Sequence, residues 1–172
     1  RVSFGLVRIA NIRPALETAR FLAARFPDAH VACYHAQDFT IRRFLKEKRL
    51  DRLLTRNNGD SHIEGDPEIR ERVFRTGSPD VKFIVVATPV EEIGRDHDFD
   101  WAVIEPSSTQ SIVQTAGRVN RHRRLPRTAP NVAILQYNFR KVRGKTIVFT
   151  QPGLETKDWP YTAKGRGPDN HK

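Results

Sequence analysis

The chain has 172 residues, with 30 Lys and Arg against 20 Asp and Glu, so its formal net charge is +10. The length suits one domain with a buried core, and the charge favours polyanionic partners such as nucleic acid, nucleotide phosphates or anionic lipid. The longest apolar run, residues 83–87, is far shorter than a membrane span. Residues 1–26 lack the layout of a signal peptide, so we expect a soluble, cytoplasmic protein with no membrane partner.

The sequence begins with Arg1 and contains no Met, which indicates a fragment of a longer protein. Its one cysteine, Cys33, excludes an internal disulfide and a multi-cysteine zinc site. The apolar neighbours of Cys33 favour an inert, buried thiol over a reactive one.

The first third of the chain alternates between strand and helix patterns. Residues 4–9 are short and apolar, and Pro14 after them suits the first turn of a helix. Residues 15–26 carry apolar side chains at steps of three and four, which predicts a helix with one buried stripe. Residues 29–34 predict a second strand and residues 39–54 a second helix. In this second helix we expect six side chains to face inward: Ile41, Phe44, Leu45, Leu50, Leu53 and Leu54.

The alternation continues through the middle of the chain. The pattern predicts a loop at residues 57–66, helices at 67–75 and 109–121, and strands at 81–87, 101–104 and 132–135. Residues 81–87 (VKFIVVA) are nearly continuous in apolar and β-branched side chains, as strands covered on both faces tend to be. The sequence therefore predicts an α/β fold, with a mostly parallel central sheet and helices on both faces.

The end of the chain has a different composition. Residues 145–149 are a candidate edge strand, whereas residues 151–172 carry Pro, Gly and charge with little to bury. We therefore expect one domain at residues 1–150, followed by a linker or docking tail at residues 151–172.

The sharpest motif lies in residues 112–124 (IVQTAGRVNRHRR), where Gln114, Gly117, Arg118 and Arg121 fit the pattern Q-x-x-G-R-x-x-R. On a helix, this spacing would place Gln114, Arg118 and Arg121 on one face. A guanidinium group stays charged and donates a forked pair of hydrogen bonds to phosphate, so two of them a turn apart can grip a triphosphate. Gly117 would let another segment pack closely. The alternative is a solvated basic helix, which is the usual fate of a run of charges.

A second motif follows the most buried predicted strand. Residues 84–96 (IVVATPVEEIGRD) end that strand with Ala87 and Thr88, reach Gly94 and present Asp96. In doubly wound sheets the ligand crevice lies beyond the carboxyl ends of the strands. We therefore expect residues 88–96 to line such a crevice.

Together these two stretches resemble motifs five and six of superfamily-two helicases, in the second of their two RecA-like domains. Residues 6–12 (LVRIANI) resemble motif four, and residues 33–37 (CYHAQ) resemble the segment that follows it. Residues 94–101 (GRDHDFDW) and 114–124 are similar to the type I-F form of the helicase-nuclease family of type I CRISPR systems. Arg95, His97 and the position of Asn11 depart from the general helicase pattern but suit this subgroup.

The resemblance implies roles around a nucleotide. Arg121 would be the arginine finger on the γ-phosphate, with support from Arg118, and Gln114 would face the nucleotide. Asp96 would contact the ribose, with Gly94 and Gly117 beside the bound nucleotide: these are the residues that the resemblance assigns to nucleotide binding.

The resemblance also implies a nucleic-acid track. Thr88 and Gly94 would lie between the nucleotide and a single-stranded backbone, so that the strand senses the state of the ATP. Asn11 and His35 are further candidates for strand contacts, with a structural role as the alternative for each.

The cofactors implied are ATP and magnesium, held mainly by a first RecA-like domain that precedes this one in the chain. That domain would bring the phosphate loop, the magnesium ligands and the carboxylate that orients water, so this chain alone would be inactive. A nuclease metal would lie elsewhere in the full protein. The partners implied are single-stranded DNA, the first RecA-like domain and a CRISPR surveillance complex, and the function is ATP-driven DNA translocation during degradation of foreign DNA.

Two other functions share these features. A superfamily-two helicase of DNA repair or RNA processing carries the same motifs. A non-enzymatic, basic nucleic-acid-binding module would also explain the charge, and its DNA affinity would depend on salt but not on nucleotide.

Two further patterns are rejected as sites. Gly144, Lys145 and Thr146 resemble the end of a phosphate loop, but Phe139 stands where that loop requires a glycine. His97 and Asp98 resemble the His-Asp pair of metal phosphohydrolases, yet the other expected ligands are not nearby. We therefore expect no metal site in this chain.

Overall fold

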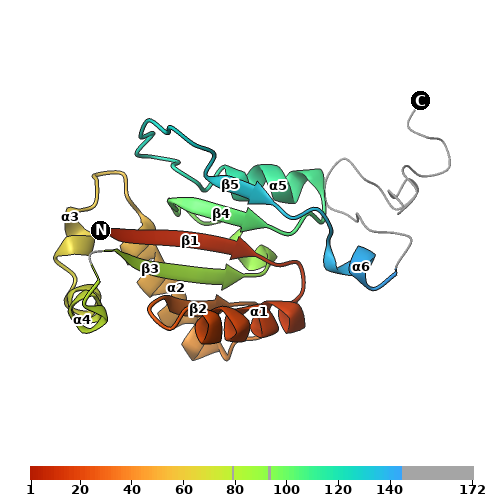
Figure 1. Cartoon of the computed structure of the whole chain (residues 1–172), viewed down its shortest axis with the longest axis horizontal. Helices are drawn as coiled ribbons and strands as arrows, with labels where there is room; N and C mark the ends of the chain where they lie inside the picture. Colours follow the sequence, from red (N-terminus) through yellow and green to blue (C-terminus); the bar gives the residue numbers. More distant parts are fainter. Residues whose placement is uncertain (79, 93, 145–172) are drawn as a thin grey trace.

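The computed structural model describes residues 1–78, 80–92 and 94–144. Five parallel strands form one sheet in the order β2-β3-β1-β4-β5 (Figure 1). Their bounds are β1 Val2–Arg8, β2 His30–Tyr34, β3 Val81–Ala87, β4 Trp101–Ile104 and β5 Val132–Ile134. The predicted α/β class with a mostly parallel sheet is confirmed. The candidate edge strand at residues 145–149 and the tail at residues 151–172 lie outside the described residues.

Helices cover both faces of the sheet. They are α1 Ile12–Arg25, α2 Thr40–Leu54, α3 Ser61–Glu64, α4 Pro67–Thr76, the 3-10 turn η1 Pro89–Glu91, α5 Thr109–Ala116 and α6 Phe139–Val142. Figure 1 shows α1 in front of the sheet, with α2 and α5 behind it. Among the helices described, none is both long and apolar enough to cross a membrane.

Local capping explains where α4 begins and ends. Pro67 opens the helix, and the side chain of Asp66 accepts a hydrogen bond from the backbone N–H of Ile69, which satisfies one of the free donors of the first turn. Gly77 ends it in the left-handed region, at φ 63°, where glycine carries no steric cost.

The core is divided by the sheet into two layers. The larger layer joins Phe4, Leu6 and Val85 with the side chains of α2, α3 and α4, while the smaller one packs Ala15 of α1 against Val7. Along β1, Phe4 and Leu6 face the larger layer and Val7 faces the smaller one. Successive side chains of a strand point to opposite faces, so both faces of the sheet are covered. The strands share one register, so Arg8, Ala87 and Ile104 end side by side. The loops after β1, β3 and β4 therefore meet at one edge.

The inward face predicted for α2 is only half right. Leu50, Leu53 and Leu54 are buried, but Ile41 is 67% exposed, and Phe44 and Leu45 are also exposed. The apolar spacing is that of a helix throughout, but only the carboxyl-terminal turns of α2 reach the core. The described residues leave the apolar side chains of its first half without cover.

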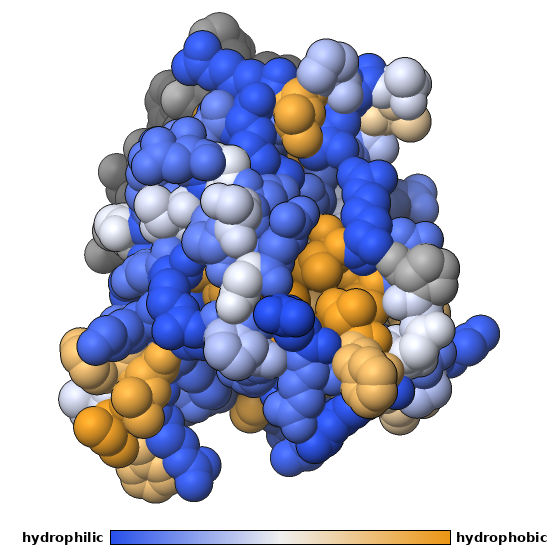
Figure 2. Space-filling model, turned by 90° about the vertical axis from the view of Figure 1, so that its left-hand side faces the viewer, coloured by the Kyte–Doolittle hydropathy of each residue, from blue (hydrophilic) through white to orange (hydrophobic). Residues whose placement is uncertain are grey.

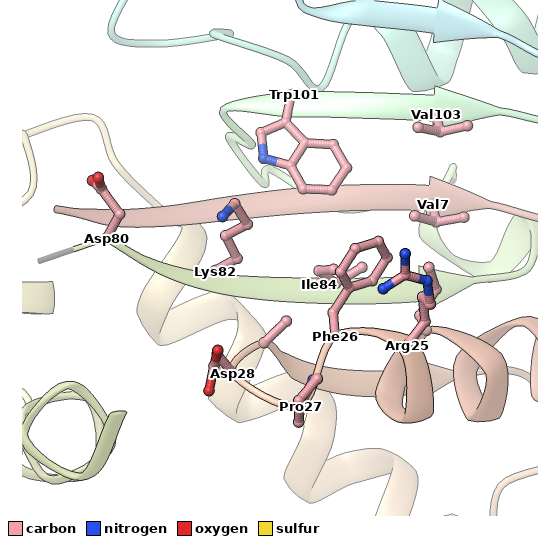
Figure 3. A pocket seen from close by; sticks show the side chains of 12 residues that line it. Val7, Arg25, Phe26, Pro27, Asp28, Asp80, Lys82, Ile84, Trp101 and Val103 are labelled. Carbon is pink, nitrogen blue, oxygen red and sulfur yellow. The ribbon is translucent and has the colours of Figure 1, made fainter. Parts of the chain in front are cut away.

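A cavity with a volume of about 550 Å³ opens on the face of the sheet that α1 covers, between the end of α1 and side chains of β1, β3 and β4. Figure 2, viewed from the end where the strands begin, shows a mostly hydrophilic surface with apolar side chains gathered around a hollow. Phe26, Ile84, Trp101 and Val103 line the cavity (Figure 3). None of the predicted site residues does, so the cavity is not the candidate site.

We predict that Gly5→Ala destabilises the chain by about 1 to 3 kcal/mol, the usual cost of overpacking. The indole ring of Trp101 lies directly over Gly5, and an added Cβ would overlap it. Chemical denaturation would measure the free energy of unfolding. Gly65→Ala is the control, because its Cβ would meet its nearest neighbour at 3.5 Å; equal losses in the two variants would contradict the prediction.

Candidate nucleotide and nucleic-acid site

The loop between β3 and β4 and the turn after α5 lie against each other, next to the start of β4. Arg121 Nε donates to Asp96 Oδ1 at 3.0 Å, and His122 Nε2 lies 2.9 Å from the same oxygen. The side chains of Arg121 and Asp96 are 43% and 51% exposed. Partial burial would raise the pKa of the Asp96 carboxyl, but the hydrogen bonds from His122 and Arg121 outweigh it and lower that pKa. Two motifs separated by more than twenty residues thus share one charged, accessible cluster.

Arg118 lies deeper in the same region. It is only 7% exposed, and its Nη2 donates to the backbone oxygen of Glu92 at 3.0 Å. Nη1 has no hydrogen-bond partner among the described residues. Burial lowers the pKa of this guanidinium, against the opposite effect of the Glu91 carboxylate, but an arginine stays charged. A buried donor without a partner costs free energy, so a ligand that accepts a hydrogen bond from Nη1 would remove that cost.

The prediction of one helix face for Gln114, Arg118 and Arg121 is wrong. Helix α5 ends at Ala116 rather than near residue 121. The chain then makes tight turns, with Arg118 N donating to Thr115 O, and Asn120 has φ 53°, a left-handed conformation that no helix contains. The two arginines therefore lie in a turn, where tertiary contacts decide their directions.

Backbone pairing fixes this turn to the start of β4. Phe99 N donates to Arg118 O and Asn120 N donates to Phe99 O, both at 2.8 Å, and Phe99 forms an isolated parallel bridge with Val119. The position of the turn is therefore set by its backbone hydrogen bonds to Phe99 and not by a continuation of α5.

A buried carboxylate completes the attachment. Asp98 is fully buried and accepts hydrogen bonds from the backbone N–H groups of Arg121, His122 and Arg123 at 3.1, 3.1 and 3.2 Å. The guanidinium of Arg123 pairs with both of its oxygens. Burial would raise the pKa of the Asp98 carboxyl, but the hydrogen bonds from Arg123 and the backbone outweigh it and lower that pKa.

Asp100 and Arg56 extend this buried ion network. Arg123 Nη1 donates to Asp100 Oδ1 at 2.7 Å, and Arg56 Nη1 donates to Asp100 Oδ2 at 3.2 Å. Burial would lower the pKa of Arg123, yet its bonds to Asp98 and Asp100 raise it. Sequence analysis missed this network. The signal was three aspartates in alternation, at 96, 98 and 100, upstream of an arginine run.

Thr88 and Gly94 occupy the two ends of the loop after β3. Thr88 is buried, and its N–H donates to Tyr34 O while its carbonyl accepts from Glu91 N. Gly94 is exposed and has φ 67°, a conformation that side chains other than glycine rarely adopt. Gly94 thus allows the loop to turn back towards Asp96.

Gln114 and Gly117 lie on the last turns of α5. Gln114 is half-buried and Gly117 is exposed. A Cβ on Gly117 would lie 3.2 Å from the carbonyl oxygen of Val113, so the close approach at this glycine is to its own helix. The close neighbour expected from another segment is not seen among the described residues.

Asn11 and His35 follow β1 and β2 at the same edge of the sheet. Asn11 is the exposed N-cap residue of α1, and its side chain makes no capping hydrogen bond. His35 is 8% exposed, with Nε2 3.9 Å from Asp38 Oδ1. Asn11 is therefore accessible to a ligand, whereas His35 is nearly enclosed.

Arg8 is a buried residue that the sequence analysis did not single out. It is 1% exposed and donates to Glu92 Oε1 at 2.7 Å, to Glu105 O at 2.9 Å and to Ser111 Oγ at 3.0 Å. Since these partners lie after β3, after β4 and on α5, one side chain ties together the segments that form the site.

Comparisons with known proteins identify the family. The family model described as CRISPR-associated nuclease/helicase Cas3, C-terminal, matches residues 1–124. The chain belongs to this Cas3 C-terminal family. Two relatives named CRISPR-associated nuclease/helicase Cas3 subtype I-F/YPEST agree with it over 165 residues: 44% identity in Pectobacterium atrosepticum, covering 91% of the chain, and 41% in Pseudomonas aeruginosa, covering 93%. The resemblance to the type I-F CRISPR helicase-nuclease is thereby confirmed.

The Cas3 relatives are much longer than this chain, which spans 15% of the length of each. The crystal structure of T. fusca Cas3 with AMPPNP has a similar fold, with a TM-score of 0.60 and 18% identity over 79% of this chain and 15% of that one. The ATP complex gives a TM-score of 0.58 at 18% identity, with the same coverage of each chain. At these identities the likeness concerns the fold.

His97, which departs from the general helicase pattern described above, lies next to Glu91 and Asp51. It is 1% exposed, with Nδ1 2.5 Å from Glu91 Oε1 and Nε2 2.8 Å from Asp51 Oδ1. Burial would lower the pKa of His97, but the bonds to Glu91 and Asp51 outweigh it and raise that pKa. The ring thus links η1 to α2. No group of three His, Cys, Asp or Glu side chains within the described ranges is placed to hold a metal ion.

We predict that the stability lost in His97→Gln depends on pH. A folded pKa above the unfolded value of about 6.5 gives a stabilisation that is complete below that value and is lost as pH rises through the folded pKa. Denaturation of both proteins from about pH 6 to 9 should therefore show the difference in unfolding free energy shrinking. Asp51→Asn, which removes one carboxylate partner, should weaken the trend. A difference that does not change with pH would contradict it.

Proposed function

We propose that this chain is the second RecA-like motor domain of an ATP-dependent single-stranded DNA translocase, which acts with a nuclease in CRISPR interference. The observation that carries the proposal is the pairing of Arg121 with Asp96: the last arginine of the motif-six pattern donates to the aspartate of the motif-five pattern at 3.0 Å, and its guanidinium stays half exposed. Membership of the Cas3 family, and the name CRISPR-associated nuclease/helicase that the relatives carry, support the proposal.

The pairing of Arg121 with Asp96 suits a finger that changes partner. An exposed ion pair contributes about 0 to 1 kcal/mol, so little opposes the transfer of the guanidinium from Asp96 to a phosphate. A triphosphate offers more charge than one carboxylate, and arginine binds phosphate through two parallel hydrogen bonds. When the first RecA-like domain closes, Arg121 would stabilise the charge on the transferring phosphoryl group.

Arg118 would act from behind Arg121. It is buried and has one free donor atom, Nη1, among the described residues, so it adds a fixed positive charge near the same point. A preorganised charge in a partly dry site stabilises developing negative charge better than one in water. Gln114 and Gly117 border this region from α5.

The other predicted contacts belong to the same proposal. Asp96, when released by Arg121, would accept a hydrogen bond from the ribose, and Gly94 would let the loop follow the nucleotide. Thr88, Asn11 and His35 would contact the single-stranded DNA, and the exposed Asn11 is the most accessible of the three. Residues 1–150 would form the motor domain, and residues 151–172 a tail that links or docks to a following region.

The proposed cofactors are ATP and magnesium. The T. fusca Cas3 structures include complexes with ATP, AMPPNP and ADP, which supports nucleotide binding in the family. Magnesium, the phosphate loop and the water-orienting carboxylate would come from the first RecA-like domain, and the nuclease metal from another part of the full protein. A CRISPR surveillance complex would deliver the DNA, in the cytoplasm of a prokaryotic cell.

We predict that Arg121→Ala in the full-length protein lowers ATP turnover by about 10³-fold or more, the magnitude of arginine fingers in related NTPases. DNA binding should stay largely intact, because the finger acts on the phosphate. Arg118→Ala should behave similarly. The measurements are DNA-stimulated ATPase rates and DNA affinity.

The control for these variants is Arg70→Ala, on the exposed surface of α4. It removes the same charge and should leave turnover unchanged. Equal ATPase rates in Arg121→Ala and the unaltered protein would refute the assignment.

We further predict that the 172 residues alone show no ATPase activity above background. No phosphate loop is present in the sequence, and half of the active site belongs to the first domain. Phosphate release with ATP and single-stranded DNA would test this. Measurable turnover by the purified chain would contradict it.

A further inference from the structure

The geometry points to Asp98 as a positioning residue that holds the turn of Arg121 in the direction needed for the ATPase reaction. This inference rests on the proposed function. It concerns a residue that makes no contact with the nucleotide itself and acts only through the backbone of its neighbours.

Three successive N–H groups converge on one carboxylate. Oδ1 of Asp98 accepts from Arg121 N, and Oδ2 accepts from His122 N and Arg123 N, all within 3.2 Å. Backbone donors arranged in this way form an anion-binding concavity, and here the anion is a side chain of the protein. Hydrogen bonds to an ionised acceptor are about twice as strong as neutral ones.

The turn needs this carboxylate because no regular structure holds it. Helix α5 has ended at Ala116, and Asn120 has φ 53°. The backbone bonds to Phe99 involve Arg118 and Asn120 but not Arg121. The first group that fixes the peptide of Arg121 is therefore Asp98 Oδ1. Asp98 therefore holds the backbone of the finger, while the side chain of Arg121 rests on Asp96.

Asp100 provides an internal comparison. It is also buried, pairs with the same Arg123 guanidinium at 2.7 Å, and accepts from Arg56 Nη1 and from Phe4 N. None of the hydrogen bonds described for it reaches the backbone of residues 121–123. Asp98 and Asp100 thus share burial, charge and an arginine partner, and they differ in contact with the turn.

Asp98→Asn tests whether the carboxylate positions the turn of Arg121 or only stabilises the fold. The amide keeps one acceptor oxygen, but its NH₂ group must face one set of the donors that Asp98 now accepts, whichever way it is turned. The turn would shift without a change in the nucleotide-binding groups of the first domain. A displacement of about 1 Å at a reacting group can cost about 10²-fold in rate, so kcat should fall while the KM for ATP stays near its original value.

The experiment compares Asp98→Asn, Asp100→Asn, Arg121→Ala and the double variant Asp98→Asn/Arg121→Ala in the full-length protein, with kcat and KM for ATP and melting temperatures. We expect both aspartate variants to lower the melting temperature, and only Asp98→Asn to lower kcat, by about 10- to 100-fold. In the double variant, Asp98→Asn should have no further effect on kcat, because it acts through Arg121.

Equal losses of kcat in Asp98→Asn and Asp100→Asn would overturn the inference, as would an Asp98→Asn effect that multiplies with that of Arg121→Ala. A normal rate in Arg121→Ala alone would instead refute the proposed function, so the two failures are distinct. If Asp98→Asn does not fold, Asp98→Glu keeps the charge and the Arg123 pairing but moves the carboxylate by one methylene. A folded Asp98→Glu protein with unchanged kcat would overturn the inference.

Discussion

The structure of the site depends on one buried ion network, in which Arg123 lies between the carboxylates of Asp98 and Asp100. A buried carboxylate is tolerated only when charges and hydrogen bonds replace its water, and Asp98 receives both from a single turn. The same bonds that make its burial affordable attach that turn to the loop after β3. The same hydrogen bonds therefore stabilise the buried Asp98 carboxylate and fix the geometry of the candidate finger.

Three arginines of the site differ in how far they are exposed. Arg8 is fully buried and fully bonded, Arg118 is buried with one free donor, and Arg121 is half exposed in a weak pair. The first can only hold segments together, the second can supply a fixed charge, and the third is free to change partner. The three guanidinium groups are chemically identical, so their different roles result from their surroundings.

The exposed apolar side chains are consistent with the place of this chain in longer relatives. The first half of α2 presents Ile41, Phe44 and Leu45 to solvent, and the relatives extend far beyond the matched region. An α/β domain that functions beside other domains does not need to bury every apolar stripe against its own sheet. The predicted inward face of α2 failed because periodicity shows which side chains share a face, but not how much of that face the core can reach.

The sequence by itself determined the strand and helix alternation, the parallel sheet, and the motifs that identify the Cas3 family. These follow from local patterns: apolar β-branched runs such as residues 81–87, and residue spacings such as Gln114 to Arg121. It also placed the loop of Asp96 directly after the buried strand β3. Only the tertiary structure decided that α5 stops at Ala116, that Arg118 is buried while Arg121 is exposed, and that Asp98 holds the turn. These features depend on contacts between residues far apart in the chain. There the free-energy cost of burying a charge outweighs helical propensity, and a local sequence pattern does not show which of the two is larger.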